Sequence, residues 1–199
     1  MSEGEQHAWE RLRSLPVEEV VARTGASFCR ETNVYSMPLL SHPVEVSLSD
    51  GIIRAGAPAA EALLSGLGHF SRRTVLGFLA HGHPGEVSGR LVRPGELPGV
   101  DAMVRGSHTL PLDKLAARYD GDLDAFTRRG EALGGVVQPH GDASLLLHPL
   151  ATLPFVLIFW SGDDEFPARA DLLLDATAHS QVPVEVLWCA MMLTVLAML

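Results

Sequence analysis

The sequence DASLLLHPLATLPFVLIFWSGDDEFPARADLLLDAT, residues 142–177, carries the clearest secondary-structure pattern of the chain. Its apolar runs end at proline or at polar turn residues, which predicts three β-strands, at residues 142–150, 153–160 and 169–177. The middle run is apolar on both faces, so we predict that it lies at the centre of a sheet. Pro149 and Pro154 interrupt the first connection, so a single membrane-spanning segment is not expected here.

The rest of the chain alternates between helical and strand patterns. Apolar residues recur at helical spacing before Gly25, the expected C-cap, with a break near Pro16. Residues 34–55 alternate in a way that predicts three short strands. A glycine- and proline-rich stretch, residues 82–107, is long enough to indicate a functional loop. Helical patterns occupy residues 58–70, 71–82, 111–120, 121–135 and 183–199.

Length and composition agree with an ordinary globular domain. The chain has 199 residues, of which 47% are hydrophobic and 20% charged. We therefore predict a single domain over residues 1–199. Its predicted fold class is α+β, with an antiparallel or mixed sheet from two strand groups and helices packed around it.

Charge and cysteine content exclude several classes of function. The net charge is −9 at pH 7, with no cluster of Lys and Arg longer than a pair, so nucleic-acid binding is not predicted. Cys29 and Cys189 lie too far apart for a disulfide framework or a zinc knuckle. The N-terminus lacks an apolar signal segment, which favours a cytoplasmic location. The uncharged residues 186–199 would form about 21 Å of helix, short of a bilayer core of about 30 Å, so we expect a buried helix or a homodimer face rather than a membrane anchor.

The order of these elements and several local motifs resemble the bacterial and archaeal family DUF3786, a domain of unknown function. The motifs are RTGASF, YSMPLL, HPVEVS, EALGG, GDASLLLHPLATLPFVLIFWSGDDEFPARADLLLDATA and PVEVLW. The resemblance covers nearly the whole chain and is most specific over residues 141–178. It implies no established activity. Some members look like fusions to an iron–sulfur domain of the kind found in corrinoid proteins, which implies an iron–sulfur or corrinoid protein as a partner. The histidines of the glycine-rich loop depart from the family pattern.

An acidic triplet follows the central apolar run directly. Asp163, Asp164 and Glu165 offer the hard oxygen ligands that divalent metals take. The same residues suit a solvated turn, because Gly162-Asp163 is common turn chemistry. Both interpretations stay open, although three consecutive side chains cannot all point at one site.

A second acidic series follows in the next strand. Asp171, Asp175 and His179 are spaced four residues apart, which places the two carboxylates on one face of either a strand or a helix. Asp175 and His179, together with Asp142, are therefore further candidate metal ligands. The alternative is the polar face of an edge strand.

Histidines gather around the glycine-rich loop. His81 and His83 flank Gly82, and His108 and His140 follow later in the chain. An H-x-H pair can place two imidazoles on one side of an extended segment, which suits a transition metal or a haem-type iron. We predict these four histidines as candidate ligands of haem, a corrinoid or a divalent metal, although each histidine alone is more typical of an ordinary surface or core residue.

The sequence leaves open whether the chain is an enzyme. It contains no G-x-S-x-G elbow and no phosphate-binding glycine loop, which removes the usual basis for hydrolase, NTPase and dinucleotide-binding functions. Our first hypothesis is an accessory module that binds a metal-containing cofactor, either a tetrapyrrole or a transition metal. The second is a metal-dependent hydrolase or lyase that uses Asp142, the acidic triplet, and His140 or His179. The third is a protein-interaction domain that dimerises through its C-terminal helix.

Overall fold

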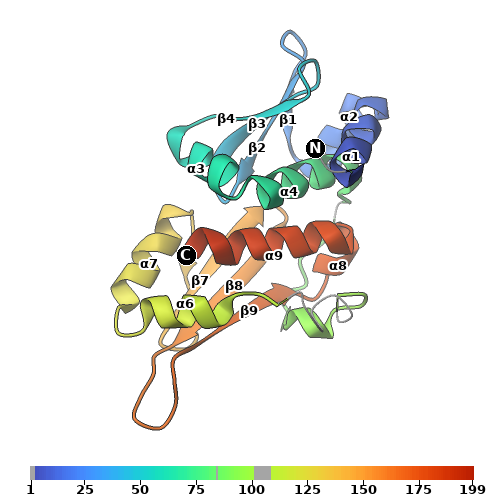
Figure 1. Ribbon diagram of the computed structural model, residues 1–199. Helices are drawn as coiled ribbons and strands as arrows, with labels where there is room; N and C mark the ends of the chain where they lie inside the picture. The colour runs from blue at the N-terminus through green and yellow to red at the C-terminus, as the bar shows by residue number, and fades with distance from the viewer. Residues whose placement is uncertain (1–2, 84, 101–108) are drawn as a thin grey trace.

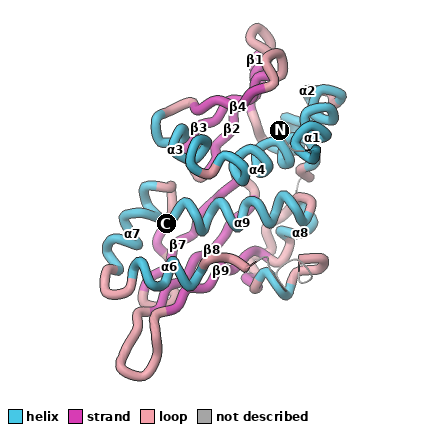
Figure 2. The backbone as a smooth tube through the Cα atoms, in the orientation of Figure 1, coloured by secondary structure: helices cyan, strands magenta, loops and turns pink. Residues whose placement is uncertain are grey.

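The computed structural model describes residues 3–83, 85–100 and 109–199. It confirms the α+β class (Figure 1, Figure 2). The two predicted strand groups form two separate antiparallel sheets, one of four strands and one of five. The sheets lie in different halves of the molecule, and a backbone hydrogen bond of 3.4 Å from Leu40 N to Pro149 O joins their neighbouring ends.

The first sheet has the strand order β1-β2-β3-β4. Its strands are β1 Ser27–Cys29, β2 Val34–Leu39, β3 His42–Ser47 and β4 Ile52–Ala55. Tyr35 pairs with Val46, and Val46 with Ile53, so the alternation in the sequence places one face of the sheet in the core. The predicted three strands are confirmed, and β1 is an additional short edge strand that the sequence pattern did not indicate.

Four helices accompany this sheet. They are α1 Glu3–Ser14, α2 Val17–Thr24, α3 Pro58–Gly66 and α4 Gly68–His81. Pro16 separates α1 from α2, and Gly25 ends α2 with a φ of 70°, as the sequence predicts. Helix α4 is the central one of the four, because it packs against α1, α2 and α3.

The second sheet has the order β5-β9-β8-β7-β6. Its strands are β5 Leu91–Val92, β6 Val136–Val137, β7 Ala143–Leu150, β8 Leu153–Trp160 and β9 Arg169–Asp175. The run that is apolar on both faces, β8, lies at the centre, which confirms the prediction. Strands β5 and β6 have two residues each, too few to leave a periodic signal in the sequence.

Helices cover one face of this sheet (Figure 1). They are α6 Leu112–Tyr119, α7 Leu123–Ala132 and α9 Val184–Met198, while α8 Ala178–Gln181 and the 3-10 helix Pro94–Glu96 are short connections. The rings of Phe126 in α7 and Phe159 in β8 lie 5.4 Å apart between centroids. Gly130 brings α7 so close to the sheet that a Cβ there would lie 2.0 Å from Leu145 Cδ1.

The apolar C-terminal run forms α9, which lies between the two halves of the molecule. It packs against α4 on one side and β7 on the other, and most of its side chains are buried. None of the described helices is both long and apolar enough to cross a membrane. Dimerisation through α9 stays a prediction, but the apolar side chains that it would use are already covered within the chain.

Candidate functional site

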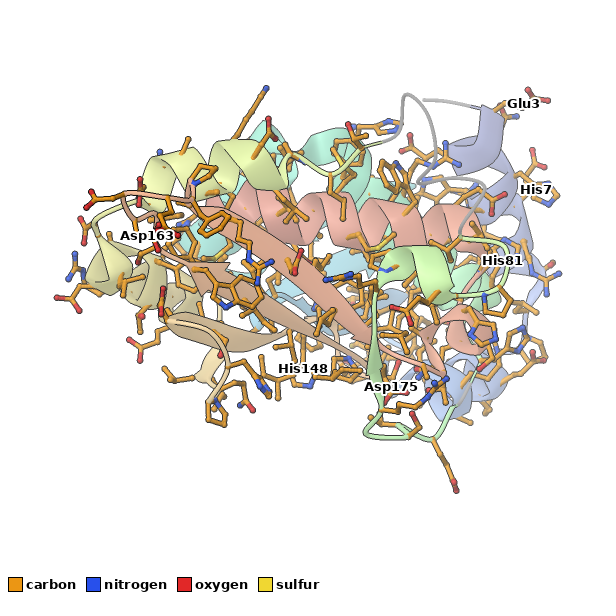
Figure 3. All side chains as sticks on the ribbon, turned by 90° about the horizontal axis from the view of Figure 1, so that it is seen from below. Glu3, His7, His81, His148, Asp163 and Asp175 are labelled. Atoms are coloured by element: carbon orange, nitrogen blue, oxygen red, sulfur yellow. The ribbon has the colours of Figure 1, made fainter. Side chains whose placement is uncertain are left out.

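The predicted ligands lie in two groups at opposite ends of the molecule. His81 ends α4 and His83 follows it, whereas His140 lies in the loop between β6 and β7. Figure 3 shows His81 and Asp163 at opposite ends of the long axis of the view. His108 lies outside the described residues. The structure therefore does not bring His81 and His83 together with the acidic triplet, whereas His140 lies at the same end of the second sheet as the triplet.

Two of the predicted carboxylates bind backbone amides of the loop between β8 and β9. Asp163 Oδ1 accepts hydrogen bonds from the backbone N–H groups of Glu165 and Phe166, at 2.8 and 2.7 Å. These donors, that of Phe166 first, lower the pKa of Asp163. Asp142 Oδ2 accepts a 2.8 Å hydrogen bond from Ser161 N. Asp163 therefore forms the turn, and Asp142 ties the start of β7 to the residue after β8, while Asp164 and Glu165 are exposed.

Asp175 is buried at the end of β9 and binds the glycine-rich loop. Its carboxylate accepts hydrogen bonds from the amides of Ser88, Gly89 and Thr177 and from the hydroxyls of Ser88 and Thr177. Burial raises its pKa, but these bonds outweigh burial and lower the pKa to about 2. Asp175 is therefore an ionised anchor for the glycine-rich loop just before β5, the short strand that pairs with β9.

The remaining members of the second acidic series point to other partners. Asp171 lies on the same strand and forms an ion pair with Arg93, at 3.5 Å. Strand β9 ends at Asp175, so His179 lies in α8, where its Nδ1 is 3.0 Å from Ala176 O. Throughout residues 3–83, 85–100 and 109–199, no three His, Cys, Asp or Glu side chains are grouped so that they could hold a metal ion.

A pocket between three helices is the best candidate site among the described residues. It has a volume of about 330 Å³ and lies between α1, α4 and the first turn of α9, and we call it the three-helix pocket. Its polar walls are formed by Glu5, Arg73, His81 and Glu185. A shallower hollow of about 610 Å³ over α1, lined in part by His7, adjoins it at Gly4. Apolar walls with a few convergent polar groups are typical of ligand sites.

Two arginines fix the end of α4 and thereby position His81. Arg11 of α1 donates a hydrogen bond of 2.9 Å from Nε to Ala80 O. Arg23 of α2 donates to the carbonyl oxygens of Gly82 and Leu79. The last carbonyls of a helix carry partial negative charge and lack partners within the helix, so cationic side chains stabilise them. The end of α4 is thus held by α1 and α2.

The electrostatic environment keeps His81 neutral. Its pKa is lowered first by burial and then by the charges of Arg11 and His7. His7, on the exposed face of α1, is nearly parallel to it, with ring centroids 6.4 Å apart and planes 16° apart. A neutral imidazole is the form that ligates a metal or accepts a hydrogen bond. Figure 3 shows both histidines at the same end of the molecule.

Cys189 lies one helical turn beyond Glu185, but its thiol is unreactive. Burial raises its pKa to about 11, although the charge of Arg73 opposes this shift. The thiolate is the nucleophilic form of cysteine, so a thiol that stays protonated at neutral pH is not a nucleophile. Cys189 is therefore a core residue near the pocket.

Sequence patterns identified only one residue of this pocket, His81. They missed Arg73 and Glu185 of the pocket and His7 of the adjoining hollow, which come from three separate helices. His7 is 74 positions from His81, and its neighbourhood in the sequence is that of an ordinary exposed helix. Only the packing of α1 on α4 brings these residues together.

The comparisons with known proteins identify the family of the chain. The structure defines the chain as an α+β protein with two antiparallel sheets and a buried C-terminal helix. Residues 16–197 match the family described as "Domain of unknown function (DUF3786)", so the chain belongs to this family. No curated protein and no solved structure matches the chain.

Proposed function

We propose that this protein is an accessory module that binds a metal-containing cofactor at the three-helix pocket, with His81 as a ligand of the metal. The observation that carries the proposal is the meeting of His81 and His7 beside a pocket with both charged and apolar walls. His7 is exposed, so its side chain is able to turn towards a metal held by His81.

The small number of protein ligands favours a metal that brings ligands of its own. A catalytic zinc site takes three protein ligands, and no such group occurs among the described residues. The iron of haem, by contrast, needs only one or two axial ligands from the protein, because the macrocycle fills its other positions. A chelated metal, which His81 would hold, therefore fits better than a bare ion, and better than the hydrolase or lyase hypothesis.

The contacts of its predicted residues give the hydrolase or lyase hypothesis less support. His140 and Asp142 lie beside the acidic triplet at one end of the second sheet, while His179 lies in α8 with its Nδ1 3.0 Å from Ala176 O. Asp163 and Asp142 are engaged by backbone amides. These contacts support turn formation rather than a shared metal.

The pocket walls suit a cofactor with charged substituents. Arg73 is a partner for a carboxylate or phosphate group, and Glu5 and Glu185 balance the charges of the arginines near His81. A volume of about 330 Å³ is at the lower end for ligand sites, so a tetrapyrrole such as haem or a corrinoid would extend into the hollow over α1. An iron–sulfur or corrinoid protein is the partner proposed to exchange it.

The proposal is tested by titrating untagged protein with haemin, a cobalamin and Co²⁺ while recording visible spectra. We expect one of these probes to give a saturable spectral change with a stoichiometry near one. His81→Ala should abolish this change or weaken binding at least about tenfold, as loss of a direct metal ligand does. His140→Ala is the matched control, because His140 is exposed and lies in the loop between β6 and β7, outside the lining of the pocket, and the variant should bind like the wild type.

The dependence on pH gives a second readout. Because the pKa of His81 is lowered, the imidazole stays neutral at pH 7, and binding should weaken only when acid protonates it. A wild-type protein that shows no spectral change with any probe would exclude this function. Equal loss in both variants would show that binding is adventitious.

A further inference from the structure

The loop between β8 and β9 projects from the molecule and presents an exposed phenylalanine. We call residues 161–168 the acidic hairpin; Figure 1 shows it extending from the end of the second sheet. Phe166 is 68% exposed, more than any other large apolar residue of the described chain. Asp163, Asp164 and Glu165 give the hairpin a strong negative charge.

The acidic hairpin is ordered by hydrogen bonds. Asp163 accepts two of them within the turn, and its own amide donates to Phe166 O at 2.9 Å. At the base, Gly162 N donates to Asp120 Oδ1 at 3.0 Å, and the Arg169 guanidinium lies 4.0 Å from the centroid of the Trp160 ring. A preorganised loop that exposes an aromatic side chain loses little conformational entropy on binding, which is typical of interface anchors.

The opposite end of the molecule contains a pocket of complementary chemistry. It has a volume of about 420 Å³ and lies between α1 and the turn from β3 to β4, with Trp9, Ile52 and Ile53 as apolar walls. We call it the Trp9 pocket. Ile52 is 40% exposed at its rim. Figure 1 shows α1 and the acidic hairpin at opposite ends of the molecule.

Positive charge surrounds the Trp9 pocket. Arg72 lines it, and the Arg13 guanidinium lies 5.2 Å from the centroid of the Trp9 ring. Arg13 also lies against Gly51, where a Cβ would be only 2.8 Å from its Nη2. Glu5 contributes one opposing charge to the wall. The rim is therefore cationic, although the chain as a whole has a net charge of −9.

We propose that the acidic hairpin of one copy of this chain docks into the Trp9 pocket of a second copy. Phe166 enters the apolar pocket, and Asp164 and Glu165 face Arg13 and Arg72 at its rim. The acidic hairpin and the Trp9 pocket are different surfaces of the chain, so the contact is heterologous rather than self-complementary. One loop in one pocket buries less surface than a standard stable interface does. The affinity should therefore be micromolar or weaker, and it should fall as salt screens the charges.

Sedimentation equilibrium over micromolar to millimolar protein concentrations tests this contact. We expect reversible self-association of the wild type that weakens with added salt. Phe166→Ser should weaken it at least about tenfold, in line with loss of an aromatic anchor. Val136→Ser is the matched control, because Val136 is also an exposed apolar residue, 58% exposed, but lies on the edge strand β6 away from both surfaces.

A mixing experiment separates this contact from a symmetric one. Ile52→Asp places a negative charge where the acidic hairpin docks, so it should abolish self-association, as Phe166→Ser does. A mixture of the two variants should nevertheless form one-to-one complexes, since the Ile52→Asp copy keeps its Phe166 and the Phe166→Ser copy keeps its pocket. A wild type that stays monomeric, an unaffected Phe166→Ser variant or a mixture without complexes would each overturn the proposal. Cofactor binding at His81 is a separate readout that these variants should leave unchanged.

Discussion

Replacing Asp175 by alanine should lower the free energy of unfolding by roughly 3 kcal/mol or more at neutral pH. Asp175 is 1% exposed, and its carboxylate accepts hydrogen bonds from the amides of Ser88, Gly89 and Thr177 as well as from two hydroxyls. Removing it leaves these donors without their acceptor and loosens the loop at Ser88 and Gly89, where only the backbone pairing of β5 with β9 would still hold it. Urea denaturation followed by circular dichroism measures the change.

The same residue should make stability dependent on acid pH. Its pKa in the folded chain is lowered to about 2, against an ordinary value of 3.8. A lowered pKa stabilises the fold above pH 4 by about 2.5 kcal/mol, and this contribution is lost as the pH falls through 4 towards 2. The Asp175→Ala variant should therefore lose less stability than the wild type over that range.

A neighbouring carboxylate provides the control. Asp171 lies on the same strand, but its ion pair with Arg93 is 3.5 Å long and partly exposed. Asp171→Ala should change the free energy of unfolding by about 0.5 kcal/mol or less. If both variants were equally stable, the loop would not depend on the Asp175 carboxylate, and the anchoring role would be wrong.

Much of the fold could be predicted because its strands and helices are long and periodic. The strands β7, β8 and β9, and the helix break at Pro16, follow directly from apolar spacing and backbone chemistry. Strands β5 and β6 could not be predicted, since they have two residues each and form only because a long strand offers its edge. The separation of the strand groups into two sheets depends on packing around α9, which no local pattern encodes.

The candidate site was predictable only in part, because helix packing brings its residues together from distant positions. Residue type alone made His81 a candidate, but its neighbour His7 and the pocket residue Arg73 come from positions that look like ordinary helix surface. The acidic triplet had two interpretations, and the turn geometry of Asp163 supports the structural one. A carboxylate that binds backbone amides and one that binds a metal use the same atoms, so sequence alone cannot distinguish them.

The contact between α4 and α9 gives the second large effect. A Cβ on Gly77 would lie 2.3 Å from Val186 Cγ2, far inside van der Waals contact. Gly77→Ala should therefore lower the free energy of unfolding by about 2 kcal/mol, although alanine is favoured over glycine in a helix by about 1 kcal/mol. Chemical denaturation measures the effect, and the sign shows whether packing or helix propensity dominates.

A compensating variant and a control variant test whether the clash with Val186 causes the loss of stability in Gly77→Ala. Val186→Ala removes the clashing methyl groups, so the double variant Gly77→Ala/Val186→Ala should be more stable than the sum of the single effects by about 2 kcal/mol. Gly66→Ala, at the end of α3 with no atom within 4 Å of the added Cβ, should be neutral or slightly stabilising. If Gly77→Ala stabilised the protein as Gly66→Ala is expected to, α4 and α9 would not be packed this closely. Both helices line the three-helix pocket. A looser contact between them would mean that the pocket has a different shape, which would weaken the case for a ligand there.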